Sequence, residues 1–296
     1  MKSIILKTLF ALAVLVSTGF VYTKLPSISG YDAKLCSLTQ ASHSGVSYAM
    51  VKIDRTGNRI KADYMAATGS YGAINSRFNN FKASHPNVVA YTSGAYMIEN
   101  GLNSYTPEGL TIDHGLILNE RLADFDGLVI VYATGGIAVS DLDDDNIKTD
   151  IGNFKIRSNP RDLISFKNWA KSNSATIFQT HLLAKDNQLK ISAYGCKRCD
   201  PCPRRFLIAS KDNSSGKVYH YIVQRDSNSP ATLYQGAKDA FDFLQGRGIN
   251  VTWMINLDTG MQDTFSFYTS DGIEHSKIHG THTIADARNL LVYYYE

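Results

Sequence analysis

The sequence has few prolines, few charged residues and only a small excess of positive charge. Its 296 residues include 7 prolines and 22 glycines, 44% are hydrophobic and 19% are charged. This composition excludes a disordered chain, a collagen-like chain and a membrane protein with several spans. The 30 Lys and Arg residues face 27 Asp and Glu residues, a balance that gives no support for a nucleic-acid partner.

Signature motifs of several large enzyme classes are missing as well. The sequence contains no G-x-S-x-G, P-loop, H-E-x-x-H or G-x-G-x-x-G pattern, which argues against α/β-hydrolases, nucleotidases, zincins and dinucleotide enzymes. His275, His279 and His282 have the spacing of one helix face, but Gly272 and Gly280 argue against a continuous helix there. We therefore predict no metal site among these residues and no cofactor. The sequence does not exclude a divalent metal ion as a cofactor.

The first residues have the layout of a secretory signal. Lys2 and Lys7 precede an apolar run over 9–16, and no acidic residue occurs before Asp32. The run is shorter than the roughly 20 residues that span a bilayer. We predict a signal peptide over 1–23, with an uncleaved anchor as the alternative. The protein is then secreted or periplasmic, and contacts a membrane only through an uncleaved leader.

The four cysteines fit such a compartment in more than one way. Cys36 stands alone, whereas Cys196, Cys199 and Cys202 form a C-x2-C-x2-C run. In an oxidising compartment the favoured interpretation is two disulfides, one of which ties Cys36 to the run. A zinc or iron–sulfur site that uses all four thiolates is the alternative.

Alternating apolar and polar residues predict two β-hairpins. The first joins 46–53 to 59–64 across a turn at 54–58, and the second joins 128–132 to 137–139 through a Gly-Gly turn. Apolar residues at three- and four-residue spacing predict a helix over 71–84, which ends before Pro86.

A second helix has the clearest start and stop signals. Ser229 is its predicted N-cap, Pro230 its first residue, and Gly246 with Gly248 its end. It leads into an apolar strand over 251–257. Together these elements predict that 24–296 is a single α+β domain with a largely antiparallel or mixed sheet and a few packed helices.

The end of that strand carries the sharpest candidate site. Asp258 follows the apolar run in a turn that Gly260 can tighten, with Asn256 before it and Gln262 behind it. Burial would raise the pKa of such a carboxyl group and a nearby arginine would lower it, and either change suits acid or base chemistry. An aspartate after a buried strand is also a common turn former, so both interpretations stay open.

Two further segments offer polar groups at strand ends. Arg204 and Arg205 precede an apolar strand, where consecutive side chains point to opposite faces, and guanidinium groups suit phosphate. A surface ion pair is the alternative. Gln179, Thr180 and His181 place an amide, a hydroxyl and an imidazole at another strand end, a mixture suited to a sugar or a phosphate ester.

The order of short motifs resembles the phosphodiester glycosidase family, which includes exported bacterial proteins. The likeness runs from Val88 to the C-terminus. The motifs that carry it are Tyr-Thr-Ser-Gly-Ala-Tyr at 91–96, Pro-Glu-Gly-Leu at 107–110, Gln-Thr-His-Leu-Leu at 179–183, the arginine pair at 204–205 and Asn-Leu-Asp-Thr-Gly at 256–260.

The resemblance implies hydrolysis at a sugar anomeric carbon with a phosphate ester as leaving group. Asp258 and Asn256 match the family's Asn-Leu-Asp signature, and Arg205 its strand-borne arginine. Gly94 and Gly109 match its two glycine loops. The implied partner is a carbohydrate or sugar-phosphate substrate.

The sequence also departs from the family pattern at three positions in two loops. Thr92 or Ser93 stands where the family usually has Asn, Ala95 replaces Gly, and Thr259 replaces the first Gly after the signature aspartate. The alternative prediction is therefore a catalytically inactive envelope module that binds glycans or cell-wall polymers.

Overall fold

The computed structural model describes residues 36–67, 73–99, 101, 104–193, 200–260, 263–269, 274–276 and 284–296. The predicted leader, Cys196, Cys199, Gln262, His279 and His282 lie outside these residues. Within them, no helix has the length and apolar character that a bilayer span requires.

Twenty-one β-strands and three α-helices occur in the described part of the chain. A seven-stranded sheet has the order β1 (Cys36–His43), β2 (Val46–Asp54), β17 (Val218–Arg225), β16 (Arg205–Lys211), β18 (Val251–Leu257), β14 (Leu182–Lys185) and β15 (Gln188–Leu189). A five-stranded sheet has the order β10 (Ile137–Asp141), β9 (Gly127–Val131), β13 (Thr176–Thr180), β7 (Thr111–Asp113) and β8 (Leu116–Asn119). A second five-stranded sheet has the order β20 (Glu274–Ser276), β19 (Phe265–Tyr268), β4 (Val88–Thr92), β21 (Asn289–Tyr295) and β3 (Ile60–Ala66). Two small hairpins pair β5 (Met97–Glu99) with β6 (Tyr105–Pro107) and β11 (Ile147–Thr149) with β12 (Gly152–Phe154).

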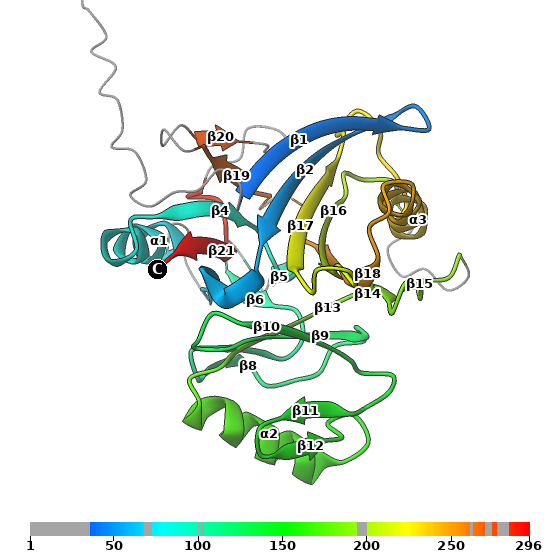
Figure 1. The fold of residues 1–296 in the computed structure, drawn as a ribbon. Helices are drawn as coiled ribbons and strands as arrows, with labels where there is room; N and C mark the ends of the chain where they lie inside the picture. Colours follow the sequence, from blue (N-terminus) through cyan, green and yellow to red (C-terminus); the bar gives the residue numbers. More distant parts are fainter. Residues whose placement is uncertain are drawn as a thin grey trace, which may run out of the picture.

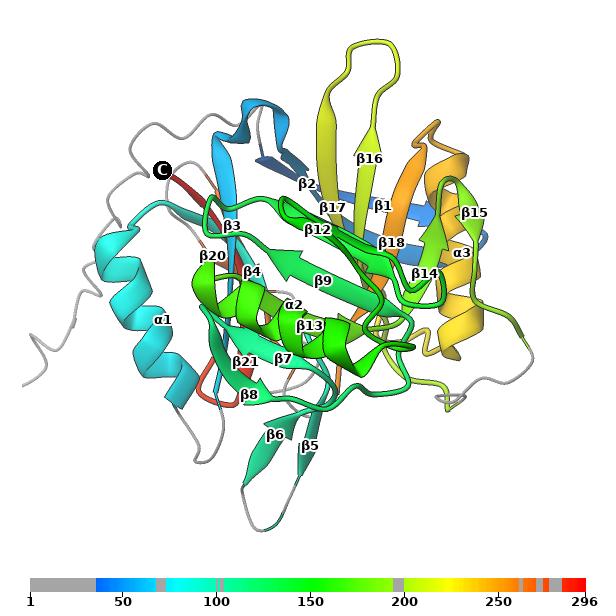
Figure 2. The ribbon, with the colours of Figure 1, turned by 90° about the horizontal axis from the view of Figure 1, so that it is seen from below.

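Each helix covers one of the three large sheets. The helices are α1 (Ala73–Ser84), α2 (Pro160–Ser172) and α3 (Leu233–Gln245). Figure 1 shows α1 and α3 on opposite sides and α2 below, and Figure 2 shows α2 crossing β9 and β13 while the β5–β6 hairpin projects from the body. The main apolar cluster draws on all three sheets, for example on Ile255, Phe178 and Leu291. The sheets therefore share one core, and each helix closes a smaller cluster outside it.

The predicted α+β class is wrong, because the fold is largely β. Three helices of 12, 13 and 13 residues accompany three sheets of seven, five and five strands in the described residues. Every strand pair there is antiparallel, so the described sheets are not mixed. Many short strands escaped detection because segments of three residues are too brief to show a period of two.

The first predicted hairpin is also wrong, although both of its strands exist. β2 pairs with β1 and β17, whereas β3 pairs with β21 in another sheet. The chain changes sheets at Arg55, whose backbone N–H donates to Val218 O at 2.8 Å while its buried guanidinium donates to Gly135 O. Alternation predicts a strand but not its partner. The second hairpin is confirmed as β9 and β10.

The helix over 71–84 is confirmed as α1, whereas the predicted start of α3 is wrong. The N-cap of α3 is Thr232, whose Oγ1 accepts from Gln235 N at 3.1 Å. Ala231 forms a bridge with Cys202, so the chain is held extended there and the helix starts only afterwards. The predicted end at Gly246 is confirmed, and α2, capped by Asn159, was not predicted.

Candidate functional site

A polar cavity of about 460 Å³ opens where β18 ends and β16 begins. Its lining combines carboxylates, one guanidinium, one imidazole and two aromatic rings. The residues that line it are Tyr96, Glu108, Asp124, Phe125, His181, Asp200, Cys202, Arg204, Asp258, Thr259 and Gly260. They come from the loops that follow β4, β6, β8, β13 and β18 and from the segment before β16. Residues far apart in the sequence therefore converge on one site.

Asp258 is fixed in the cavity wall by its turn. Its backbone N–H donates to Gly94 O at 3.0 Å, and its carboxylate Oδ1 accepts from Gly260 N at 3.0 Å. The next residue, Thr259, donates its hydroxyl to Pro203 O at 2.6 Å. The side chain of Asp258 is nearly buried, with a relative exposure of 9%. The turn therefore joins the end of β18 to the Gly94 loop and to the start of β16.

The Gly94 loop is held by Asn289, a residue of β21 that the sequence did not single out. The Oδ1 of Asn289 accepts from Gly94 N at 2.7 Å and from Ala95 N at 3.0 Å, and its Nδ2 donates to Ala95 O at 2.9 Å. A Cβ on Gly94 would lie 2.8 Å from the ring of Tyr64, so only glycine fits. Gly94 thus shapes the loop but does not line the cavity.

Asn256 and Thr180 support the cavity from behind. Asn256 is buried, and its Nδ2 donates to the hydroxyl of Tyr96, which lines the cavity. The hydroxyl of Thr180 donates to Asn256 O at 2.7 Å, and Asn256 N donates to His181 O at 3.0 Å. These bonds fasten the ends of β13 and β18 together.

His181 faces the cavity among aromatic rings. Its ring centroid lies 4.7 Å from that of Phe125 and 6.0 Å from that of Tyr96, both in edge-on contacts. Its Nδ1 lies 3.9 Å from the Oδ1 of Asp126. Burial raises the pKa of Asp126, while a hydrogen bond from Leu182 N opposes that shift.

Gln179 and Gly109 organise the two loops that bring Glu108 and Asp124 to the cavity. The Oε1 of buried Gln179 accepts from Leu110 N at 2.7 Å and from Ala123 N at 2.9 Å. Gly109 has a φ of +87°, and a Cβ there would lie 2.7 Å from the same Oε1. Gln179 therefore positions both loops, Gly109 shapes the first of them, and neither residue lines the cavity.

Arg204 lines the cavity and is held at its inner end. Its Nε donates to Ala231 O at 2.9 Å and its Nη2 donates to Asp200 O at 3.0 Å. Gly236 of α3 leaves room for it, because a Cβ there would lie 2.9 Å from the Cγ of Arg204.

Arg205 lies on the other face of the sheet, away from the cavity lining. Its side chain is fully buried, its Nη1 donates to Asp263 Oδ1 at 2.6 Å and to Thr92 Oγ1 at 3.1 Å, and its guanidinium lies 4.7 Å from the centre of the Phe265 ring. Thr92 and Ser93, where the sequence departs from the family pattern, are buried beside this ion pair.

The structure therefore brings together four of the predicted site residues and separates others. Asp258, Gly260, His181 and Arg204 line the cavity, whereas Gln179, Thr180, Asn256, Gly94 and Gly109 lie behind it and Arg205 lies apart. Asp124 and Phe125 were missed, because they occupy a loop without any periodic pattern. Glu108 and Asp200 were visible only inside motifs singled out for other residues.

Neither the cysteines nor the histidines form a metal site in the described residues. No group of three or more His, Cys, Asp or Glu side chains there could hold a metal ion. Cys36 is buried at the start of β1, and burial raises the pKa of its thiol. Cys202 lines the cavity. The predicted disulfides involve Cys196 and Cys199, and the histidine group for which no metal site is predicted includes His279 and His282. These four residues lie outside the described residues.

Comparisons with known proteins reveal only a distant likeness of fold. The sequence matches no protein-family model and no curated protein. A hypothetical protein from Synechocystis is 9% identical over 88% of this chain with a TM-score of 0.50, and the chain spans 62% of that protein. The catalytic domain of zebrafish N-acetylglucosamine-1-phosphodiester alpha-N-acetylglucosaminidase, auto-inhibited by its pro-peptide, is 12% identical over 92% of this chain and 86% of that one, with a TM-score of 0.49. A Burkholderia pseudomallei protein described as exported is 8% identical over 84% of this chain and 74% of that one, with a TM-score of 0.47.

Proposed function

We propose that the protein is an exported hydrolase that cleaves a glycosyl phosphodiester in the cavity beside Asp258. The observation that carries the proposal is the convergence of Asp258, His181 and Arg204 with the carboxylates of Glu108 and Asp124 on one opening. Glycoside hydrolysis commonly uses a pair of carboxyl groups, and a guanidinium suits the phosphate of the leaving group. The order of the motifs along the chain supports the same reaction class.

The cavity residues divide the chemistry among them. Water adds to the anomeric carbon, the bond from that carbon to the phosphate oxygen breaks, and a phosphomonoester leaves. Asp258 acts as acid, base or hydrogen-bond partner of the sugar, and Arg204, which lines the cavity, offers its charge to the phosphate in place of Arg205, which does not line it. Asn256 and Gln179 position the loops around them.

Replacing one carboxylate tests this proposal. Asp258→Asn removes the titratable group with little change in shape and should lower the turnover of a sugar 1-phosphodiester by roughly 10²–10⁴-fold. Asp144→Asn is the matched control, because that carboxylate is largely exposed and outside the cavity. Product release is measured alongside the circular dichroism spectrum. An unchanged rate in a folded Asp258→Asn variant would contradict the proposal.

The alternative function is a module that binds glycans without cleaving them. The observation that favours it is the turn at Asp258, because a carboxylate that accepts a backbone N–H two residues on is a common turn-forming arrangement. Saturable binding of the sugar phosphodiester by the unaltered protein, without release of product, would select this alternative.

A further inference from the structure

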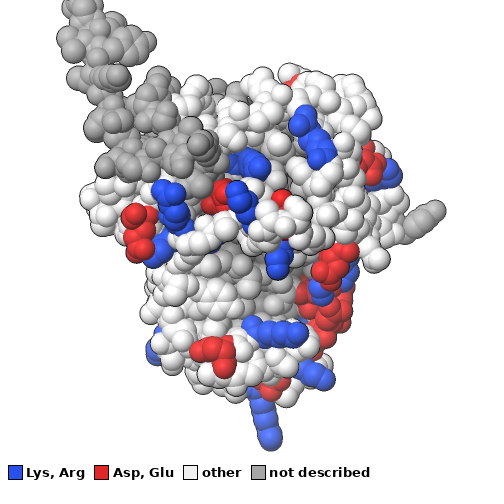
Figure 3. Space-filling model, viewed as in Figure 1, with Lys and Arg blue, Asp and Glu red and all other residues white. Residues whose placement is uncertain are grey.

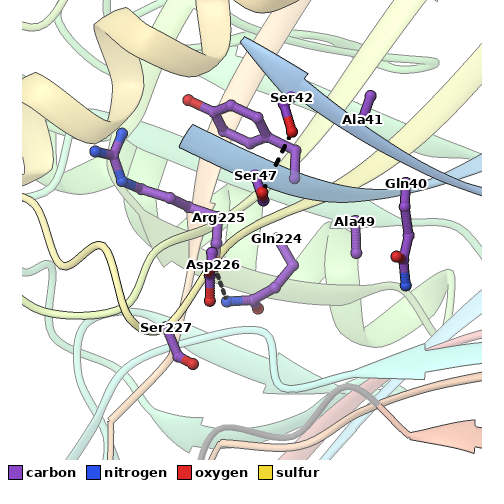
Figure 4. A pocket seen from close by; sticks show the side chains of 10 residues that line it. Gln40, Ala41, Ser42, Ser47, Ala49, Gln224, Arg225, Asp226 and Ser227 are labelled. Atoms are coloured by element: carbon purple, nitrogen blue, oxygen red, sulfur yellow. Dashed lines mark hydrogen bonds between the residues drawn. The ribbon is translucent and has the colours of Figure 1, made fainter. Parts of the chain in front are cut away.

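A second pocket of about 430 Å³ lies at the same end of the seven-stranded sheet as the cavity. It is formed by the hairpin of β1 and β2, the last residues of β17 and the loop after them. Figure 4 shows Gln40, Ala49 and Gln224 along it, with Ser42 and Ser47 joined by a hydrogen bond of 3.3 Å.

Strand register explains why this part of the sheet is hollow. Gln224 stands opposite Ala49, and Ala49 stands opposite Gln40 on the next strand. Since strands lie about 4.8 Å apart, the two carboxamides flank a gap of roughly 10 Å above the small methyl group of Ala49. Ser42 and Ser47 are also opposite each other and add two hydroxyls to the same hollow.

The charged groups around the pocket are already engaged within the fold. Arg225 donates to Asp239 Oδ2 at 2.5 Å and to Ser229 O at 2.6 Å. Asp226 accepts from Asn228 N at 3.1 Å within its own loop. Amides and hydroxyls are therefore the groups best placed for a ligand, and they suit an uncharged molecule rich in hydroxyls.

Gln224 supplies the observation that points to a missing partner. The residue is buried, with a relative exposure of 8%, and its Nε2 donates to Arg225 O at 2.8 Å. Its Oε1 has no hydrogen-bond partner among the described residues. Buried acceptors are normally paired, so a donor from a ligand would satisfy this oxygen.

The pocket and the cavity lie along one row of the sheet, and Gln224 points to the face of Arg205, opposite to the face of Arg204. Leu257, which precedes Asp258, stands opposite Arg205, and Arg205 stands opposite Gln224. From Leu257 to Ala49 is three strand spacings, or about 15 Å. A chain of several sugar units spans such a distance by passing around the end of the sheet, where both sites lie.

We propose that this second pocket binds an uncharged saccharide unit of an extended substrate. The substrate class is then an oligosaccharide or glycan polymer that carries the phosphodiester. This inference rests on the proposed function of the cavity, but its binding step is testable separately.

The test measures binding of uncharged tetrasaccharides to the full chain by calorimetry. The probes are maltotetraose, cellotetraose and chitotetraose, and the variants are Gln224→Ala and the double variant Ser42→Ala/Ser47→Ala. Gln188→Ala is the control, because that glutamine is exposed on β15. At least one probe should bind saturably. Each pocket variant should raise the Kd of that probe by about tenfold, as expected for one lost hydrogen bond with a buried partner.

Two outcomes would overturn the inference: no probe binds, or neither pocket variant changes the Kd. If Gln224→Ala does not fold, the double serine variant still decides. Turnover of a small sugar 1-phosphodiester should stay unchanged in the double serine variant. If Asp258→Asn lowers turnover but no tetrasaccharide binds, only the second pocket is rejected. If a tetrasaccharide binds in the pocket but Asp258→Asn leaves turnover unchanged, only the proposed reaction is rejected.

Discussion

Two consecutive arginines at the start of β16 have opposite surroundings. Arg204 is 3% exposed, lines the cavity and donates to two backbone carbonyl oxygens, whereas Arg205 is fully buried on the other face and paired with Asp263. Strand geometry alone sends them apart. The comparison shows that the same residue type, one position apart, serves the cavity in one case and the joint between two sheets in the other.

Replacing Arg205 should have the largest effect, and the effect should be on stability. Arg205→Met leaves Asp263 as a buried charge without its guanidinium, which costs about 3–5 kcal/mol when one member of a buried pair is removed. Urea denaturation measures the change in the free energy of unfolding. The double variant Arg205→Met/Asp263→Leu should recover part of the loss, since neither charge remains.

The same variants also test whether Arg205 takes part in the chemistry. The folded fraction of the double variant should keep most of its kcat, because Arg205 is not in the cavity lining. A stable variant with lost kcat would instead give Arg205 the phosphate-binding role that the sequence predicts.

Replacing Arg204 should impair turnover, with a smaller loss of stability than at Arg205, because Ala231 O and Asp200 O each lose a donor. Arg204→Gln removes the guanidinium charge from the cavity, and kcat/KM for a sugar 1-phosphodiester should fall by roughly 10²–10³-fold, as for loss of one preorganised donor to a developing charge. Arg204→Lys keeps the charge without the planar guanidinium group, and its kcat/KM should lie between those of the unaltered protein and Arg204→Gln. Equal kcat/KM in all three proteins would exclude Arg204 from the site.

The arginines also illustrate how far the sequence predicts the site. Residue type, strand ends and alternation were enough to single out Asp258, His181 and both arginines. They could not tell which arginine faces the cavity, because that depends on α3 and β19 packing on opposite faces of β16. Asp124 depends entirely on a loop that Gln179 folds inward.

The fold class was predicted wrongly, although several of the individual elements were predicted correctly. Long strands and α1 follow from local periodicity, so β9, β10 and β18 appear where expected. Strand partners depend on tertiary contacts, such as those of Arg55 that separate β2 from β3.

On the face shown in Figure 3, lysine and arginine side chains lie scattered, and no continuous basic patch is seen.

A smaller effect on Arg204 is expected from a substitution in α3. Gly236→Ala adds a Cβ 2.9 Å from the Cγ of Arg204, so the arginine must shift. Alanine favours the helix by about 1 kcal/mol, which offsets much of the crowding. Stability should change little, while kcat/KM falls by about tenfold because of misplacement. The matched control is Lys238→Ala, at an exposed position of α3, which should leave kcat/KM unchanged. A loss of stability without a loss of kcat/KM would show that Arg204 tolerates the shift.

The smallest effect is expected at His114, which lies between two carboxylates and can lose its proton. The Nδ1 of His114 lies 2.6 Å from Asp113 Oδ1 and its Nε2 lies 3.1 Å from Asp63 Oδ1. Hydrogen bonds to Asp113 and then to Asp63 raise the pKa of His114 to about 10. Its side chain is 47% exposed, so solvent screens much of the stabilisation.

The sign of the pH dependence follows from proton binding. Between the unfolded pKa of about 6.5 and the folded pKa of about 10, folded His114 keeps a proton that the unfolded chain releases. The free-energy difference between the unaltered protein and His114→Gln should therefore be full below pH 6.5 and decline as the pH rises toward 10. Urea titrations across this range measure it, and added salt should reduce it. A difference that stays constant with pH would show that His114 is not held as a cation.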